Sequence, residues 1–270
     1  MTDQENRAQD IRDAVINKSK YSQIAPGLVE AIARKELEKG RSIKEAIKET
    51  AGKLHQAAAG YFPRKVNYSH LTKELIRLPA DLEAPESKRF CLHAMEAHSS
   101  TRERLPILET FFRETLASIA PVRSILDLGC GMNPMALAWM PVSENPAYYG
   151  CDIFQDLVGF LEQFRGHFKT RGMFSVCNLL DLHFTNQAQV GFLLKTLTCL
   201  EQLEKDIAGK LLEAVPCEYL LVSYPVKSLG GRGKGMRKNY EEQFIELTAG
   251  KGWGVTRFEF TDELAFLVKK

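Results

Sequence analysis

Two hydrophobic patterns divide the chain near residue 105. Before that point apolar residues recur at helical spacing, and from Ser124 onward short apolar runs alternate with amphipathic stretches. Apolar positions three and four residues apart predict helices, whereas short apolar runs bounded by glycine or polar residues predict strands. We therefore expect a helical N-terminal domain over residues 1–105, followed by an α/β domain over residues 106–270.

The helical part carries recognisable start and stop signals. Residues 25–40 have helical spacing between a proline near the start and a glycine at the end. Residues 42–61 open with Ser42 and Glu45, the spacing of a capping box, and continue as an alanine-rich helix. Further helices are expected at about 86–97 and 101–118.

The second part alternates between strands and helices. The expected strands cover residues 124–131, 147–153, 173–180, 190–197, 218–226, 254–260 and 264–270. The expected helices cover residues 135–140, 155–168 and 237–250. This alternation predicts a mostly parallel sheet that is covered by helices on both faces, with the last two strands as a terminal pair.

Composition changes this picture little. The chain has 270 residues, of which 44% are hydrophobic and 26% charged, as in ordinary globular proteins. No apolar run approaches the roughly 20 residues that cross a bilayer, and the acidic, polar first ten residues lack the apolar core of a signal peptide. We expect a cytoplasmic protein with no membrane association.

Charge adds a hint about the partner. The net charge is only +2, but residues 1–105 carry 19 Lys and Arg against 15 Asp and Glu, whereas residues 106–270 carry 17 against 19. Residues 223–240 hold five cations and no acid. Local basicity at two places indicates a polyanionic partner.

The six cysteines are scattered without a C-x-x-C pair that would indicate zinc or redox chemistry. Several lie in apolar runs that resemble strands. We expect them to be small buried hydrophobic residues in a reducing compartment, and we expect no metal site.

Acids and glycines follow the first three expected strands. The sequence DLGCG supplies Asp127, Gly129 and Gly131 after the first strand, Asp152 ends the second strand, and Asp181 follows the third. An acid about 20 residues beyond such glycines is placed to accept both ribose hydroxyls, and an acid after the third strand would lie near an adenine amino group. This combination is the pattern of S-adenosylmethionine (SAM) methyltransferases.

Two other interpretations compete with a SAM site. Tight turns between a strand and a helix use glycine for steric reasons alone. A dinucleotide site would need a third small residue where this chain has Pro134.

Several longer segments carry a family resemblance: residues 98–106, 125–137, 148–153, 193–202 and 223–236. In these segments, and in residues 20–36, the chain resembles the aminoglycoside-resistance 16S rRNA methyltransferases, which modify N7 of guanine 1405 (ribosomal numbering). The resemblance implies a class I, Rossmann-like SAM-dependent methyltransferase fold with a seven-stranded, mostly parallel sheet, and a helical N-terminal domain that binds rRNA.

The resemblance also implies cofactor contacts. Arg102 should pair with the SAM carboxylate, although without the resemblance a surface cation paired with a neighbouring acid such as Glu103 would be favoured. The remaining expected cofactor-binding residues are Gly129, Gly131, Asp152, Ile153, Asp181 and Leu182.

Guanine N7 carries a lone pair and no hydrogen, so methylation needs alignment and the exclusion of water rather than a base. The guanine must be flipped out of the RNA helix and stacked on a side chain. Met236 and Tyr224 are the candidates, and the resemblance favours Met236, which could otherwise only anchor the following helix. Lys227 and Arg232 are expected beside the reacting base.

Cations are expected to hold the RNA phosphates. The expected RNA-binding residues are Lys18, Lys20, His55, Arg64, Lys65, Lys195 and Lys234. Each N-terminal member of this set could equally be solvated surface.

We therefore expect a monomeric enzyme that transfers a methyl group from SAM to N7 of guanine 1405 in the 30S subunit and confers aminoglycoside resistance. The product would be S-adenosylhomocysteine (SAH). Two alternatives stay open: a methyltransferase of another rRNA position, and a non-catalytic RNA-binding or assembly protein.

Overall fold

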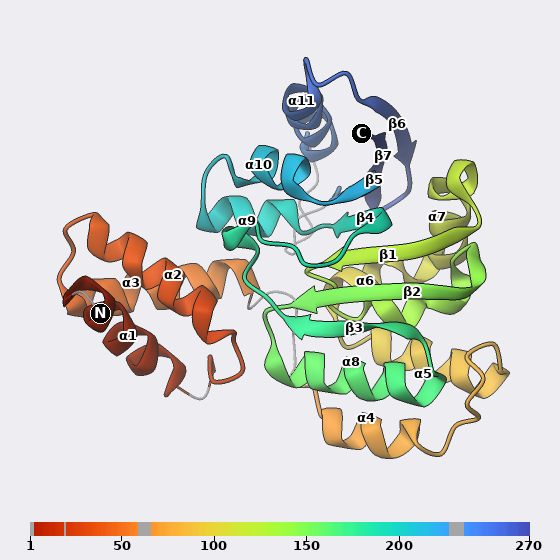
Figure 1. The fold of residues 1–270 in the computed structure, drawn as a ribbon, viewed down its shortest axis with the longest axis horizontal. Coiled ribbons are helices and arrows are strands. Elements are labelled where there is room, and N and C mark those ends of the chain that lie inside the picture. The colour runs from red at the N-terminus through yellow and green to blue at the C-terminus, as the bar shows by residue number, and fades with distance from the viewer. Residues whose placement is uncertain (1–2, 19, 59–65, 227–234) are drawn as a thin grey trace.

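The computed structural model describes residues 3–18, 20–58, 66–226 and 235–270. A seven-stranded sheet lies at its centre in the order β3-β2-β1-β4-β5-β7-β6 (Figure 1). The strands are β1 (Val122–Leu128), β2 (Val142–Asp152), β3 (Arg171–Val176), β4 (Ala188–Leu194), β5 (Cys217–Pro225), β6 (Gly254–Glu259) and β7 (Glu263–Lys269). Only β7 is antiparallel to its neighbours β5 and β6, so the predicted mostly parallel sheet is confirmed.

Helices surround this sheet. The α-helices are α1 (Asp3–Ile16), α2 (Pro26–Glu38), α3 (Ile43–Ala58), α4 (Tyr68–Leu75), α5 (Pro85–Met95), α6 (Ser99–Arg104), α7 (Leu108–Thr115), α8 (Gln155–Phe168), α9 (Leu197–Leu203), α10 (Ile207–Ala214) and α11 (Met236–Thr248). Short 3-10 helices cover Leu105–Ile107, Ala117–Ile119, Asn133–Trp139 and Leu179–Asp181.

The predicted helices are found with two differences. The helix expected over 101–118 is broken around Pro106 into α6, a 3-10 turn and α7, because proline cannot donate an interior helical hydrogen bond. The helix expected over 135–140 is a 3-10 helix over Asn133–Trp139 rather than an α-helix. One predicted strand is also shorter: the strand expected over 190–197 ends at Leu194, and Leu197 already begins α9.

Consecutive residues of β1 point to opposite faces of the sheet, as strand geometry requires. Ile125 joins the core formed with α4, α5, α7 and α8, whereas Leu126 joins the core formed with α9, α10 and α11. Both faces of the sheet are therefore covered.

A third core lies within α1, α2 and α3, which form a group facing the carboxyl ends of β2 and β3 (Figure 1). This α1–α3 group is joined to the loop after β2 by backbone hydrogen bonds from Ala25 to Ile153 (2.7 Å) and from Gln155 to Gln23 (2.8 Å). By contrast, Leu71 of α4 and Phe90 of α5 lie in the core shared with the sheet. The N-terminal helices thus reach the sheet edge where β2 ends.

The chain order reverses between β1 and β4, the two central neighbours from which β2 and β5 lead outward in opposite directions. In open α/β sheets, ligands bind outside the carboxyl ends of the strands at such a point. Within the described part of the chain, no helix is both long and apolar enough to cross a membrane.

Candidate active site

The turn after β1 requires glycine at two positions. Gly129 has φ +72°, and a Cβ there would lie 2.9 Å from Cγ2 of Thr196. Gly131 has φ +50°, and its Cβ would lie 2.9 Å from Cε1 of His98. Positive φ and the close neighbours both exclude larger residues, so the backbone itself forms this part of the site.

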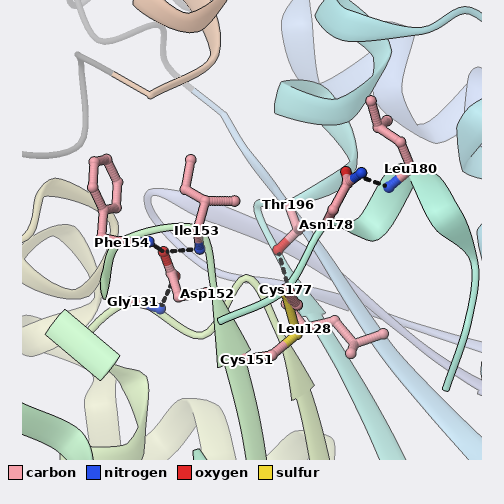
Figure 2. Close-up of a disulfide and its surroundings, with 10 residues drawn as sticks. All are labelled: Leu128, Gly131, Cys151, Asp152, Ile153, Phe154, Cys177, Asn178, Leu180 and Thr196. Atoms are coloured by element: carbon pink, nitrogen blue, oxygen red, sulfur yellow. Dashed lines mark hydrogen bonds between the residues drawn. A yellow bond between two sulfur atoms is a disulfide. The ribbon is translucent and has the colours of Figure 1, made fainter. Parts of the chain in front are cut away.

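Asp152 holds this turn from the end of β2. Its carboxylate accepts hydrogen bonds from the backbone N–H groups of Gly131 (2.8 Å), Ile153 (2.7 Å) and Phe154 (3.3 Å), as Figure 2 shows. Burial raises the pKa of Asp152, and these three N–H groups act against the rise. The side chain is 7% exposed. The contact of this acid with the hydroxyls of a ribose stays a prediction.

A pocket opens beside this acid and the glycine turn. Its wall combines the carboxyl ends of β1, β2 and β4 with one residue each from α2 and α3. The apolar side is lined by Leu28, Ala57, Ile153, Phe154, Leu179, Leu194, Leu200 and Leu203, and the remaining lining residues are His98, Ser100, Gly129, Asp152, Cys177, Lys195, Thr196 and Cys199. We call it the cofactor pocket.

Lys195 lines this pocket. It is 3% exposed, and its Nζ lies 2.7 Å from Oε2 of Glu103 and 3.5 Å from Oε2 of Glu263. Two carboxylates thus already neutralise this buried ammonium group, and the phosphate contact of Lys195 stays a prediction.

Arg104 is a site-supporting residue that the sequence reasoning missed. It is 1% exposed, and its guanidinium donates to Glu263 through Nε (3.0 Å) and Nη2 (2.6 Å) and to Oδ1 of Asn133 through Nη1 (3.1 Å). A signal was present: Arg104 lies four residues before Leu108 and seven before Phe111, on the apolar face of the helical segment.

Arg102, the predicted partner of the SAM carboxylate, is exposed, and its Nη2 lies 3.5 Å from Oγ of Ser99. It does not line the cofactor pocket. Its role stays a prediction.

The structure does not bring Asp181 and Leu182 to the cofactor pocket. Asp181 is exposed, accepts a hydrogen bond from Nδ2 of Asn178 (3.0 Å), and lines a second cavity of about 270 Å³. Leu182 has φ +50° and packs against the core on the α9–α11 side of the sheet. Their adenine contacts stay predictions.

Asp127 anchors a buried polar network beneath the pocket. Its Oδ2 accepts hydrogen bonds from the hydroxyl of Tyr148 (2.6 Å) and from Nδ2 of Asn133 (2.8 Å). Burial raises the pKa of Asp127 to about 6, against the effect of these hydrogen bonds. Through Asn133 the network continues to Arg104 and Glu263.

The two residues proposed for base stacking differ in how far they are buried. Tyr224 is fully buried and stacks on Tyr240 with ring centroids 4.9 Å apart, so it is not available to a flipped base. Met236 is the half-buried first residue of α11. Lys227, Arg232 and Lys234 lie outside the described residues.

Two predicted RNA-binding residues of the N-terminal part meet in space. Lys20 Nζ lies 2.8 Å from Nδ1 of His55, and both side chains are exposed, as is Lys18. Arg64 and Lys65 lie outside the described residues.

The cysteines were predicted to be separate buried residues, and for one pair this is wrong. Cys151 and Cys177 form a disulfide (Figure 2). They lie 26 residues apart in sequence, but β2 and β3 are paired strands, which places their Cα atoms 5.6 Å apart. Cys91 and Cys130 are buried and free. Among the described residues, no cluster of three or more His, Cys, Asp or Glu could hold a metal ion.

Comparison with known proteins decides the family. The sequence profile of the family described as "Ribosomal RNA methyltransferase (FmrO)" matches residues 17–267. The chain belongs to this ribosomal RNA methyltransferase family. The predicted family is thereby confirmed, and the similarity to the solved structure described next confirms the predicted class I fold.

Relatives within this methyltransferase family match over nearly the whole chain. A 16S rRNA (guanine(1405)-N(7))-methyltransferase of Micromonospora echinospora is 32% identical over 269 residues, which cover 98% of each protein. The enzyme of the same name from Serratia marcescens is 29% identical, with 97% of this chain and 98% of that protein covered. The crystal structure of the 16S rRNA methyltransferase RmtF in complex with SAH has a TM-score of 0.80 and 28% identity, covering 100% of this chain and 99% of that one.

Proposed function

We propose that this protein transfers a methyl group from SAM to N7 of guanine 1405 of 16S rRNA within the 30S subunit, and thereby confers aminoglycoside resistance. The observation that carries the proposal is the end-to-end similarity to relatives named for this reaction. The preformed pocket beside Gly129 and Asp152 supports it.

The residues of the cofactor pocket fit SAM. The turn at Gly129 and Gly131 leaves room that a Cβ would fill, and Asp152 is placed for the ribose. Ile153 and Leu200 supply apolar surface for an adenine ring. SAM supplies a methyl group on a positively charged sulfur atom. We keep Arg102 as the partner of its carboxylate, and Asp181 and Leu182 as adenine contacts.

Charge inside the pocket suits a reaction without a base. His98 lines the pocket and is buried, and burial together with nearby Lys195 and the Arg104 guanidinium lowers its pKa to about 3. It is therefore neutral at physiological pH and does not repel a cationic sulfonium. Guanine N7 donates its lone pair directly, so the protein has only to align the base and exclude water.

The target base has to leave the RNA helix, because N7 lies in a groove that is too narrow for side chains. We propose that Met236 stacks on the flipped guanine, with Lys227 and Arg232 beside it. Met236 begins α11, the next helix along the chain after β5, and β5 runs parallel to β4, whose carboxyl end lies at the cofactor pocket.

We propose that residues 1–105 form the rRNA-binding part and residues 106–270 the catalytic part of a monomeric, cytoplasmic enzyme. The exposed pair Lys20 and His55 and the nearby Lys18 supply phosphate contacts, together with Arg64, Lys65 and Lys234. The α1–α3 group lies against the loop that follows Asp152, so RNA held by this group can reach the cofactor pocket.

Transfer of tritium from labelled SAM tests the proposal. We expect label in 30S subunits and none in 50S subunits or naked 16S rRNA. Asp152→Ala should lower SAM affinity about 10–100-fold, since hydrogen bonds to a charged group contribute roughly 1.5–3 kcal/mol. Glu144→Ala, at an exposed site on the same strand, is the matched control. Label in naked rRNA or 50S subunits would favour another target, and no label in any substrate would favour a non-catalytic protein.

A further inference from the structure

The disulfide lies directly beneath the cofactor pocket. Cys151 precedes Asp152 in β2, and Cys177 is the first residue after β3 (Figure 2). Their Cα separation of 5.6 Å is within the range that a disulfide spans without backbone movement. Two thiols at these positions can therefore be joined and separated while the strands stay paired.

Both cysteines are connected to the backbone that binds the cofactor. The carbonyl oxygen of Cys151 accepts hydrogen bonds from the N–H groups of Gly129 and Cys130, each 2.9 Å. The N–H of Cys177 donates to the carbonyl oxygen of Asp152 at 3.0 Å. A covalent bond between the two sulfur atoms thus ties the wall after β3 to the glycine turn and to the ribose acid.

The pair can be reached without passing through the cofactor pocket. Cys151 and Cys177 both line the second cavity, of about 270 Å³, together with exposed polar residues such as Asp181 and Thr185. Among the described residues this cavity shares only Cys177 and Leu179 with the cofactor pocket. A small thiol or disulfide in this cavity can therefore meet the sulfur atoms while the cofactor is bound.

Three of the four other cysteines are poorly suited to such chemistry. Burial raises the pKa of Cys91 to about 12, that of Cys217 to about 11 and that of Cys130 well above its usual range. These thiols stay protonated at neutral pH, whereas the thiolate is the attacking species in exchange.

We propose that Cys151 and Cys177 are a reversible redox site whose disulfide form binds SAM and SAH more tightly than its dithiol form. The oxidant is a low-molecular-weight disulfide such as oxidised glutathione. The thiolate of Cys177 attacks one sulfur of that disulfide and releases one small thiol, and Cys151 then displaces the second from the mixed disulfide. Two electrons pass to the small disulfide, and the two protons end on the two released thiols.

The change in affinity follows from the loss of a covalent restraint. Reduction leaves residue 177 joined to residue 151 by non-covalent contacts alone. Leu179, two residues on in the cofactor pocket, and residues 182–187, a segment without helix or strand, are then held less firmly. Holding a binding wall in place raises affinity by lowering the ordering needed on binding.

Calorimetric titration of the full-length protein with SAH tests this proposal, after incubation with oxidised glutathione or with dithiothreitol. We expect alkylation and mass spectrometry to find Cys151 and Cys177 blocked only after oxidation, and SAH to bind about tenfold more tightly in that state. Cys177→Ser and Cys151→Ala should each abolish the difference, and Cys217→Ser should retain it. Equal affinities in the two states, or alkylation of both thiols after oxidation, would overturn the proposal. Neither readout depends on the RNA target, so these results are separate from the test of methyl transfer.

Discussion

Arg104 offers a sharp test of how the site is supported, because its neighbour Arg102 is an exposed control. The Arg104→Met substitution removes the guanidinium and keeps an apolar side chain of similar length. In the structure this group donates to both oxygens of Glu263 and to Asn133. Its carbon Cζ also lies 4.7 Å from the ring centre of Phe111.

The expected loss of stability follows from the carboxylate of Glu263, which stays buried after the substitution. Removing one partner of a buried ion pair costs about 3–5 kcal/mol, since the other charge stays buried. Glu263 would retain Lys195, whose Nζ is 3.5 Å away, so the lower end of that range applies. We expect the free energy of unfolding to fall by about 3 kcal/mol, which at roughly 2–4 °C per kcal/mol lowers the Tm by about 6–12 °C.

Urea denaturation and thermal unfolding measure this loss, and SAH titration separates it from binding. Arg102→Met should leave the unfolding free energy within about 0.5 kcal/mol of the parent, as for other exposed positions, and should weaken SAH binding if Arg102 holds the cofactor carboxylate. If Arg104→Met unfolds within 1 kcal/mol of the parent protein, the Arg104–Glu263 pair does not support the site as argued.

Three further predictions test other parts of the account. The pKa of Asp127 is raised to about 6 from an ordinary 3.8. The contribution of this carboxyl group to the free energy of unfolding is therefore present below pH 4 and is lost as the pH rises through 6. In urea denaturation from pH 4 to 8, the free energy of unfolding of the parent should fall by about 3 kcal/mol relative to that of Asp127→Asn. The same pH dependence in both proteins would contradict this. Gly129→Ala should lower the free energy of unfolding by about 1–2 kcal/mol, because of the positive φ and the contact with Thr196. Gly159→Ala, in open space on α8, should instead raise it by about 0.5–1 kcal/mol. Equal effects of the two substitutions in urea denaturation would refute the steric argument. Met236→Ala should keep near-normal affinities for SAH and 30S subunits while turnover falls about 10–100-fold, and a matching loss of 30S affinity would remove the stacking role.

The sequence patterns predicted those features whose signals lie in neighbouring residues. Helix α8 begins and ends where the amphipathic stretch does, because its apolar residues recur at helical spacing and face one core. Ser42 and Glu45 make the reciprocal hydrogen bonds of the predicted capping box. The glycines after β1 and the acid ending β2 meet at one sheet edge because parallel strands end together.

Features that depend on distant partners could not be predicted in the same way. Lys195 looked like an exposed cation, but its carboxylate partners lie 92 and 68 residues away in Glu103 and Glu263. Cys151 and Cys177 meet only because β2 and β3 pair in register. Helix α1 was overlooked because it is mostly polar, although Ala8, Ile11 and Val15 form its buried stripe.

Mapping the methylated nucleotide tests the central claim most directly. 30S subunits treated with the protein and SAM are cleaved chemically at N7-methylguanine, and the breaks are located by reverse transcription. The account predicts one new stop, at guanine 1405, which at limiting SAM is weaker with Asp152→Ala and unchanged with Glu144→Ala. A stop at another nucleotide, or cleavage that is unchanged by the protein, would contradict it.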